Sequence, residues 1–143
     1  MTKLNITELL DMIEENGKNY NVASGGGKYS LSIVNNINGK RVTLSKTLSS
    51  DLNITDEVHF LPVPSENILI VSSKSISSKS ASCPMSGQDG KKICYAAGVV
   101  KMITEAFALD YSNVTSLSFN NISFDMIKGQ KVALVDMTPK KAQ

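Results

Sequence analysis

Four basic residues and no carboxylate lie between residues 28 and 50 of this 143-residue chain. Two of them, Lys40 and Arg41, follow a run rich in asparagine. Arginine and asparagine side chains can hydrogen-bond to guanine and adenine edges in the major groove, which admits a two-stranded β ribbon. Lysines at the flanks can contact phosphates. The pattern predicts a DNA-binding hairpin with the contact residues Lys28, Asn36, Asn38, Lys40, Arg41 and Lys46. Basic residues at strand edges also deter aggregation, and that alternative stays open.

A glycine run, Gly25-Gly26-Gly27-Lys28, precedes this stretch and invites comparison with a phosphate-binding loop. A P-loop needs glycine five residues before its Gly-Lys pair and serine or threonine after it. This chain has Val22 and Tyr29 at those positions. We therefore interpret the run as a flexible loop, whose amides could still touch a phosphate without any motif.

Cysteine and histidine are too few to indicate metal or catalytic chemistry. Cys83 and Cys94 form no Cys-x-x-Cys pair, and His59 is the single histidine, so we expect no zinc site and no cofactor. No nucleophile–histidine–acid set can be assembled, and we expect the protein not to be an enzyme. We expect reduced structural thiols, with Cys83 exposed. His59 alternates with Val58 and Phe60, which predicts that it faces solvent from a strand.

Composition is that of an ordinary globular protein with an aliphatic core. Hydrophobic residues make up 41% of the chain, tryptophan is absent, and the net charge is +2. No apolar run approaches the roughly 18 residues of a membrane span. The N-terminus lacks the apolar region of a signal peptide. We expect a cytoplasmic protein that does not enter a membrane.

The first half of the chain predicts a short helix followed by a β-rich unit. Capping and periodicity indicate a helix from Thr7 to about Gly17, and residues 1–28 form an N-terminal helix and loop. Residues 29–73 predict a strand, a turn at 36–39 with positive φ angles, a returning strand, a short helix capped by Ser45 or Thr47, and two further strands. The last of these strands is the apolar run 68–71.

A polar stretch separates this unit from a second one. Residues 74–89, rich in serine and lysine, predict a flexible linker. Residues 90–137 predict a strand, a helix at about 96–109, and strands at 114–119, 122–126 and 131–137, with a turn at Lys128-Gly129. The order of elements repeats that of the first unit, which suggests a degenerate tandem repeat. Residues 138–143 are expected to fray. The fold class is therefore α+β.

Residues 29–73 resemble the AbrB/MazE/SpoVT-like swapped-hairpin DNA-binding family. The segment Arg41-Val42-Thr43-Leu44-Ser45-Lys46-Thr47-Leu48 matches the family's R-V-T-L-P-K-x-L, apart from serine in place of proline. Leu52-Asn53-Ile54 matches L-G-I, again with one change, and 56–60 matches D-x-V-x-F. The resemblance implies a DNA-binding transcriptional regulator that forms a homodimer, or a pseudo-dimer within one chain if the second unit is a repeat. Ser49 and Ser50 replace basic residues of the family, so the hairpin tip must supply most of the binding.

A second hypothesis places the chain in another class. Small size, nearly balanced charge and an asparagine-, lysine- and serine-rich composition also suit a phage or mobile-element inhibitor. Such an anti-CRISPR, anti-defence or antitoxin-like factor would bind a host protein. Its contacts would rest on aromatic anchors such as Tyr20, Tyr95 or Tyr111.

Overall fold

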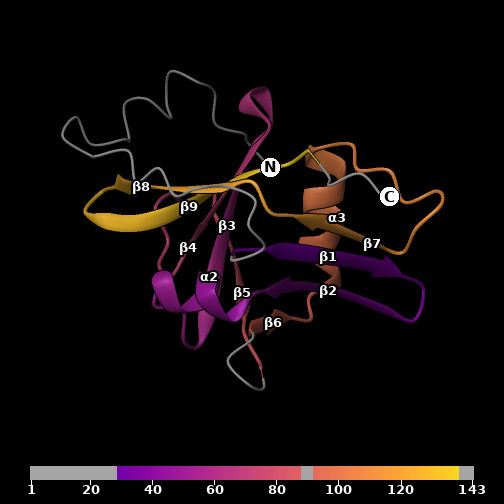
Figure 1. Ribbon diagram of the computed structural model, residues 1–143, viewed down its shortest axis with the longest axis horizontal. Helices are drawn as coiled ribbons and strands as arrows, with labels where there is room; N and C mark the ends of the chain where they lie inside the picture. The colour runs from indigo at the N-terminus through magenta and orange to yellow at the C-terminus, as the bar shows by residue number, and fades with distance from the viewer. Residues whose placement is uncertain (1–28, 88–91, 139–143) are drawn as a thin grey trace.

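The computed structural model describes residues 29–87 and 92–138. Along the chain the elements are β1 (Leu31–Asn36), β2 (Gly39–Leu44), α2 (Lys46–Asp51), β3 (Glu57–Val63), η1 (Pro64–Glu66), β4 (Ile68–Ser72), β5 (Ala81–Pro84), β6 (Lys92–Cys94), α3 (Ala97–Ala106), β7 (Ser116–Phe119), β8 (Ile122–Ile127) and β9 (Gln130–Asp136) (Figure 1). The α+β class is confirmed, in a strand-rich form with two antiparallel sheets. The helix expected within residues 1–28 lies outside the described residues.

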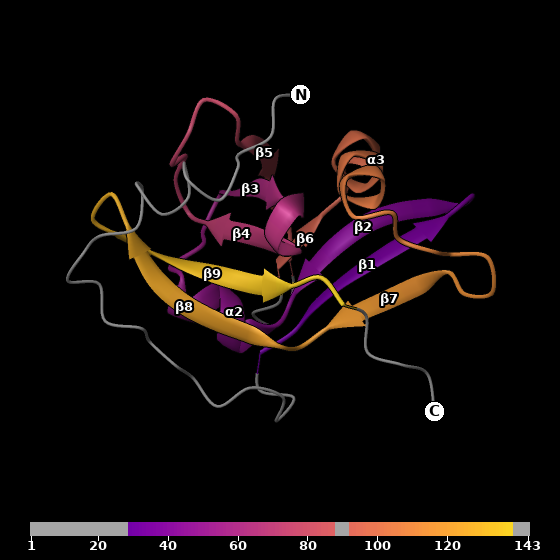
Figure 2. The ribbon, with the colours of Figure 1, turned by 90° about the horizontal axis from the view of Figure 1, so that it is seen from above.

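Each sheet combines strands from both halves of the chain. The four-stranded sheet has the order β6-β2-β1-β7, and the five-stranded sheet has the order β5-β3-β4-β9-β8. Figure 2 shows β7 leading directly into β8, so that one continuous stretch passes from the first sheet to the second. Strands within residues 29–73 therefore pair with strands within residues 92–137 in both sheets.

Local sequence signals explain the elements that surround the hairpin. Ser45 begins α2 as its N-cap, and its hydroxyl accepts a hydrogen bond from the Leu48 amide at 3.4 Å. Leu48 and Leu52 turn into the core and are 0% and 3% exposed. The Lys128-Gly129 turn between β8 and β9 has φ angles of 51° and 78°. Left-handed angles at both central residues are those of a tight hairpin turn, as the sequence predicts.

The main core lies between the two sheets and under α3. It includes Leu31, Ile33 and Val42 from the hairpin, Phe60 from β3 and Ile103 from α3. A second, smaller cluster covers the other face of the five-stranded sheet, and its buried members are Leu61, Val63, Ile70, Ile76, Ile127 and Val132. The central strands β3 and β4 are therefore buried on both faces.

The described part of the predicted linker, residues 74–87, contains a strand and buried side chains. Ile76 is 2% exposed and joins the smaller cluster. Strand β5 pairs with β3, with Cys83 opposite Val58 in the main core. Although this stretch is rich in serine, two of its side chains are buried on opposite faces of the five-stranded sheet. Cys83 belongs to the main core and Ile76 to the smaller cluster. This placement holds the stretch against the sheet.

Candidate nucleic-acid interface

The tip of the β1–β2 hairpin is a two-residue turn. Asn36 pairs with Gly39, which leaves Ile37 and Asn38 as the central residues. The Asn38 amide donates a hydrogen bond to Oδ1 of Asn36 at 3.3 Å, and this contact fixes the turn. Ile37 is 93% exposed. The turn lies where the sequence predicts it, but the expected positive φ angles are wrong: neither central residue nor Gly39 adopts one.

The loop that leads into β7 supports the hairpin from one side. The Asn35 amide donates to the Thr115 carbonyl at 2.8 Å, one residue beyond the β1–β7 ladder. The Tyr111 hydroxyl donates to the Ile33 carbonyl at 3.2 Å, and burial raises the pKa of Tyr111 to about 12. The hairpin is thus braced as far as Asn35, and the loop between α3 and β7 reaches at least as far on this side of the molecule as the β1–β2 turn (Figure 1).

Arg41 lies on the outer face of the hairpin, directly opposite Val34. It lines a cleft of about 420 Å³, whose other lining residues are Val34, Asn36, Asn38, Gly39, Thr115 and Ser116. The guanidinium lies over Gly39, where an added Cβ would be 3.7 Å from its Nη1 atom. Within the part of the chain that the structure describes, this half-buried guanidinium has no hydrogen bond and no ion pair. A planar cation with five donors is therefore available to an anion in the cleft.

Lys40 occupies the opposite face of the same hairpin. Its ammonium donates to Oδ1 of Asn35 at 3.0 Å and to the Asn36 carbonyl at 3.4 Å. These contacts hold the charge close to the turn. Lys40 also lines a groove of about 400 Å³ between the hairpin and α3, together with Asn35, Ala97, Gly98, Lys101, Thr104 and Glu105. The hairpin end therefore presents cations on both faces.

Lys101 is a member of this surface that the sequence does not reveal. Val99, Val100 and Ile103 are the buried residues of α3, so helical periodicity alone places Lys101 on the exposed side. The sequence does not show that α3 lies across β1 and β2 (Figure 2). That packing brings Lys101 to the groove that Lys40 lines.

The structure brings together four of the six predicted DNA contacts, namely Asn36, Asn38, Lys40 and Arg41. Lys46 is exposed at the start of α2, beyond the other end of β2. It is five positions after Arg41, which corresponds to roughly 16 Å along an extended chain. It does not belong to the tip. Lys28 lies outside the described residues.

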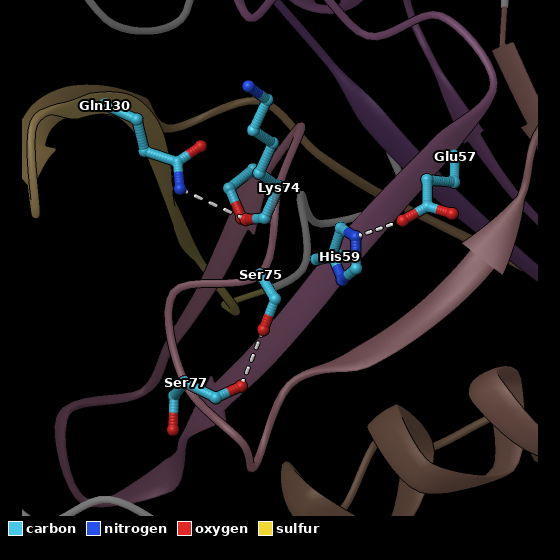
Figure 3. Close-up of polar contacts among 7 residues, drawn as sticks. Glu57, His59, Lys74, Ser75, Ser77 and Gln130 are labelled. Atoms are coloured by element: carbon cyan, nitrogen blue, oxygen red, sulfur yellow. Dashed lines mark hydrogen bonds and ion pairs between the residues drawn. The ribbon is translucent and has the colours of Figure 1, made fainter.

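His59 is buried, and the expectation that it faces solvent is wrong. It is 8% exposed, and its Nε2 lies 2.6 Å from Oε2 of Glu57 (Figure 3). The stretch 73–80 covers this face of the sheet and is held there by contacts such as Gln130 Nε2 to the Lys74 carbonyl at 3.2 Å. Among the described residues no three histidine, cysteine, aspartate or glutamate side chains gather as a metal site.

Cys83 and Cys94 form a disulfide, so the expectation of reduced thiols is wrong. Their Cα atoms are 6.1 Å apart, within the usual range for the bond. The cysteines are 1% and 0% exposed, which also corrects the expected exposure of Cys83. The bond joins β5 at the edge of one sheet to β6 at the edge of the other. Sequence spacing alone could not show that these two edges meet.

The chain matches no protein-family model, no curated protein and no solved structure. The likeness of residues 29–73 to the AbrB family therefore rests on the sequence motifs. Within the described part, no helix is both long and apolar enough to cross a membrane.

Proposed function

We propose that this protein binds DNA through the hairpin end, as a small transcriptional regulator with an AbrB-like N-terminal half. The observation that carries the proposal is the guanidinium of Arg41, half-buried in a cleft without a partner among the described residues. A partly desolvated charge is costly unless an opposite charge meets it. Phosphate oxygens and the acceptor atoms of base edges both match its fork of donors.

The groups around Arg41 fit the same ligand. Asn36 and Asn38 line the cleft with it and can donate to base or sugar oxygens. Lys40 and Lys101 add positive charge on the adjoining face. Arg41 on one face and Lys40 and Lys101 on the other outnumber Glu105, which lines the groove of the two lysines, and this excess of positive charge suits a polyanion. A cytoplasmic regulator that dimerises, either as two chains or through two related halves, completes the proposal.

Binding of duplex DNA in a series of salt concentrations tests this function. Arg41→Ala should weaken binding about 5- to 100-fold and reduce the salt dependence by about one released counterion. Lys74→Ala is the matched control, because it removes one exposed positive charge from the stretch 73–80, outside the hairpin. If the wild-type protein binds no DNA, or if the two variants weaken binding equally, the hairpin end is not the DNA site.

A protein partner is the second candidate, and the exposure of Tyr95 favours it. Tyr95 is 64% exposed between β6 and α3, and tyrosine is a frequent anchor in protein interfaces. Tyr111 is half-buried and supports the hairpin, while Tyr20 lies outside the described residues. An inhibitor of a host protein should retain that protein in a pull-down after nuclease treatment. Tyr95→Ala should abolish the capture and leave DNA binding unchanged.

A further inference from the structure

The turn of the β1–β2 hairpin contains an isoleucine, Ile37, whose side chain is not buried in the fold. Ile37 is one of three large hydrophobic residues that are exposed among the described residues, the others being Tyr95 and Val114. Central positions of tight turns favour glycine, asparagine and aspartate, and β-branched residues have no conformational advantage there. Ile37 contributes almost no burial to the core, because 93% of it is exposed. Its side chain is free for a contact outside the chain.

The part of the hairpin beyond its last contacts with neighbouring strands is short. On one side, the β1–β7 ladder and the Asn35–Thr115 hydrogen bond accompany β1 as far as Asn35. On the other side, β6 pairs with β2 only at Val42–Leu44. Two residues beyond Asn35 extend roughly 7 Å, which is close to the minor-groove depth of about 7.5 Å. A turn of this length can reach base edges, with the loop before β7 beside it (Figure 2).

We propose that Ile37 is a wedge that enters the minor groove of DNA and partly unstacks one base step, which bends the duplex. This inference rests on the proposed DNA-binding function. Proteins that bind the minor groove place arginine, lysine and asparagine against its edges and insert apolar side chains between base steps. The tip holds this combination: Ile37 at its end, Asn36 and Asn38 beside it, and Lys40 and Arg41 behind it on opposite faces.

The geometry also predicts a sequence preference. Minor-groove edges of A·T pairs carry acceptors without the amino group of guanine, which suits the donors of Asn36, Asn38 and Arg41. Pyrimidine–purine steps such as TA unstack most easily. The wedge should therefore favour an A·T-rich site with a central TA step. A mismatch at that step lowers the cost of unstacking and should tighten binding by the wild-type protein by about tenfold.

The experiment combines binding and bending on one duplex of about 30 base pairs with a dye at each end. Wild-type protein should raise energy transfer between the dyes as the DNA bends. Ile37→Ala should abolish the bend and the gain from the mismatch, with affinity reduced less than about tenfold because the polar contacts remain. Val114→Ala is the matched control, since it removes an exposed aliphatic side chain from the adjoining loop. Both sites are on the surface, and thermal melts confirm that the variants fold.

The outcomes separate the two proposals. A wild-type protein that binds DNA without bending it, or an Ile37→Ala variant that bends it equally, overturns the wedge and leaves the DNA-binding function standing. A wild-type protein that does not bind any duplex overturns both. If Ile37→Ala instead abolishes capture of a protein partner and has no effect on DNA, Ile37 is a protein anchor and the wedge is wrong.

Discussion

Reduction of the Cys83–Cys94 disulfide should lower the free energy of unfolding by about 3 kcal/mol. The two cysteines are 11 residues apart in sequence. In the chain-entropy description, a closed loop of this length removes roughly 9 cal/mol/K of entropy from the unfolded chain, which is about 2.8 kcal/mol at 25 °C. For a chain of this size, each kcal/mol corresponds to about 2–4 °C in Tm, so the reduced protein should melt about 6–12 °C lower.

Urea unfolding of the oxidised and the reduced protein measures this difference. The reduced protein should also have the steeper dependence on urea, because its unfolded chain is less compact and exposes more surface. A variant with both Cys83→Ala and Cys94→Ala is the control, since reductant should not change its midpoint. Equal midpoints for the oxidised and reduced wild-type protein would refute the reasoning, as would two titratable thiols in the native protein purified without reductant.

The same bond bears on where the protein works. Disulfides are rare in the cytoplasm, where a DNA-binding regulator acts, and persist in oxidising compartments. Both cysteines are almost completely buried, which restricts access of a reductant to the sulfur atoms of the folded protein. Trapping of free thiols in cells that express the protein distinguishes an oxidised bond kept by burial from one that forms only after lysis.

Three further predictions concern stability. The pKa of Tyr111 rises from 10.0 to about 12, so its contribution is complete below pH 10 and is lost as the pH rises to 12. Two pKa units correspond to roughly 2.7 kcal/mol, but the hydroxyl is only partly desolvated, so we expect a loss of about 1 kcal/mol in the free energy of unfolding as the pH rises. Tyr111→Phe should remove this loss. Urea midpoints at pH 9 and pH 11.5 measure the difference for both proteins. An unchanged pH dependence in the variant would contradict this. Gly129 has a φ of 78°, so Gly129→Ala should destabilise the folded protein by about 1 kcal/mol. Lys128 has a φ of 51°, which asparagine adopts readily, so Lys128→Asn should be neutral or stabilising. Thermal melts in which both variants shift the Tm in the same direction would refute the role assigned to the turn. A fragment of residues 1–73 should not fold alone, because β1 loses β7, β2 loses β6 and β4 loses β9; a cooperative melt of this fragment would show an autonomous unit.

Local signals in the sequence predict much of the first half. The Asn36–Gly39 turn, the Ser45 cap and the apolar strand at 68–71 each depend on neighbours within a few residues, and each is present. The turn at Lys128-Gly129 was predicted for the same reason, without its left-handed backbone angles. The asparagine and glycine at 38–39 were misleading only about the backbone angles, because the turn is in the predicted place but neither residue has a positive φ.

Contacts between distant segments could not be predicted in this way. The burial of His59 depends on the stretch 73–80, which looks polar in sequence but carries Ile76 across the sheet. The disulfide depends on the meeting of two sheet edges that no spacing rule connects. In both cases a single side chain within the serine-rich stretch makes the contact, Ile76 in the first and Cys83 in the second. The average composition of the stretch does not indicate either contact.

The candidate site also combines residues that local sequence signals bring together with residues that only distant contacts add. Asn36, Asn38, Lys40 and Arg41 are close in sequence, and hairpin pairing alone brings them together. Thr115, which closes the Arg41 cleft, and Lys101, which extends the basic groove, come from the second half of the chain. The second half therefore sets where the support of β1 ends, because the Asn35–Thr115 hydrogen bond lies one residue beyond the β1–β7 ladder. A ribbon without that support could lie along a major groove, whereas a braced ribbon offers only its tip. The second half of the chain thus supports the hairpin up to Asn35 and leaves Ile37 exposed at the turn, and for this reason the proposed DNA contact depends on Ile37 more than on the length of the strands.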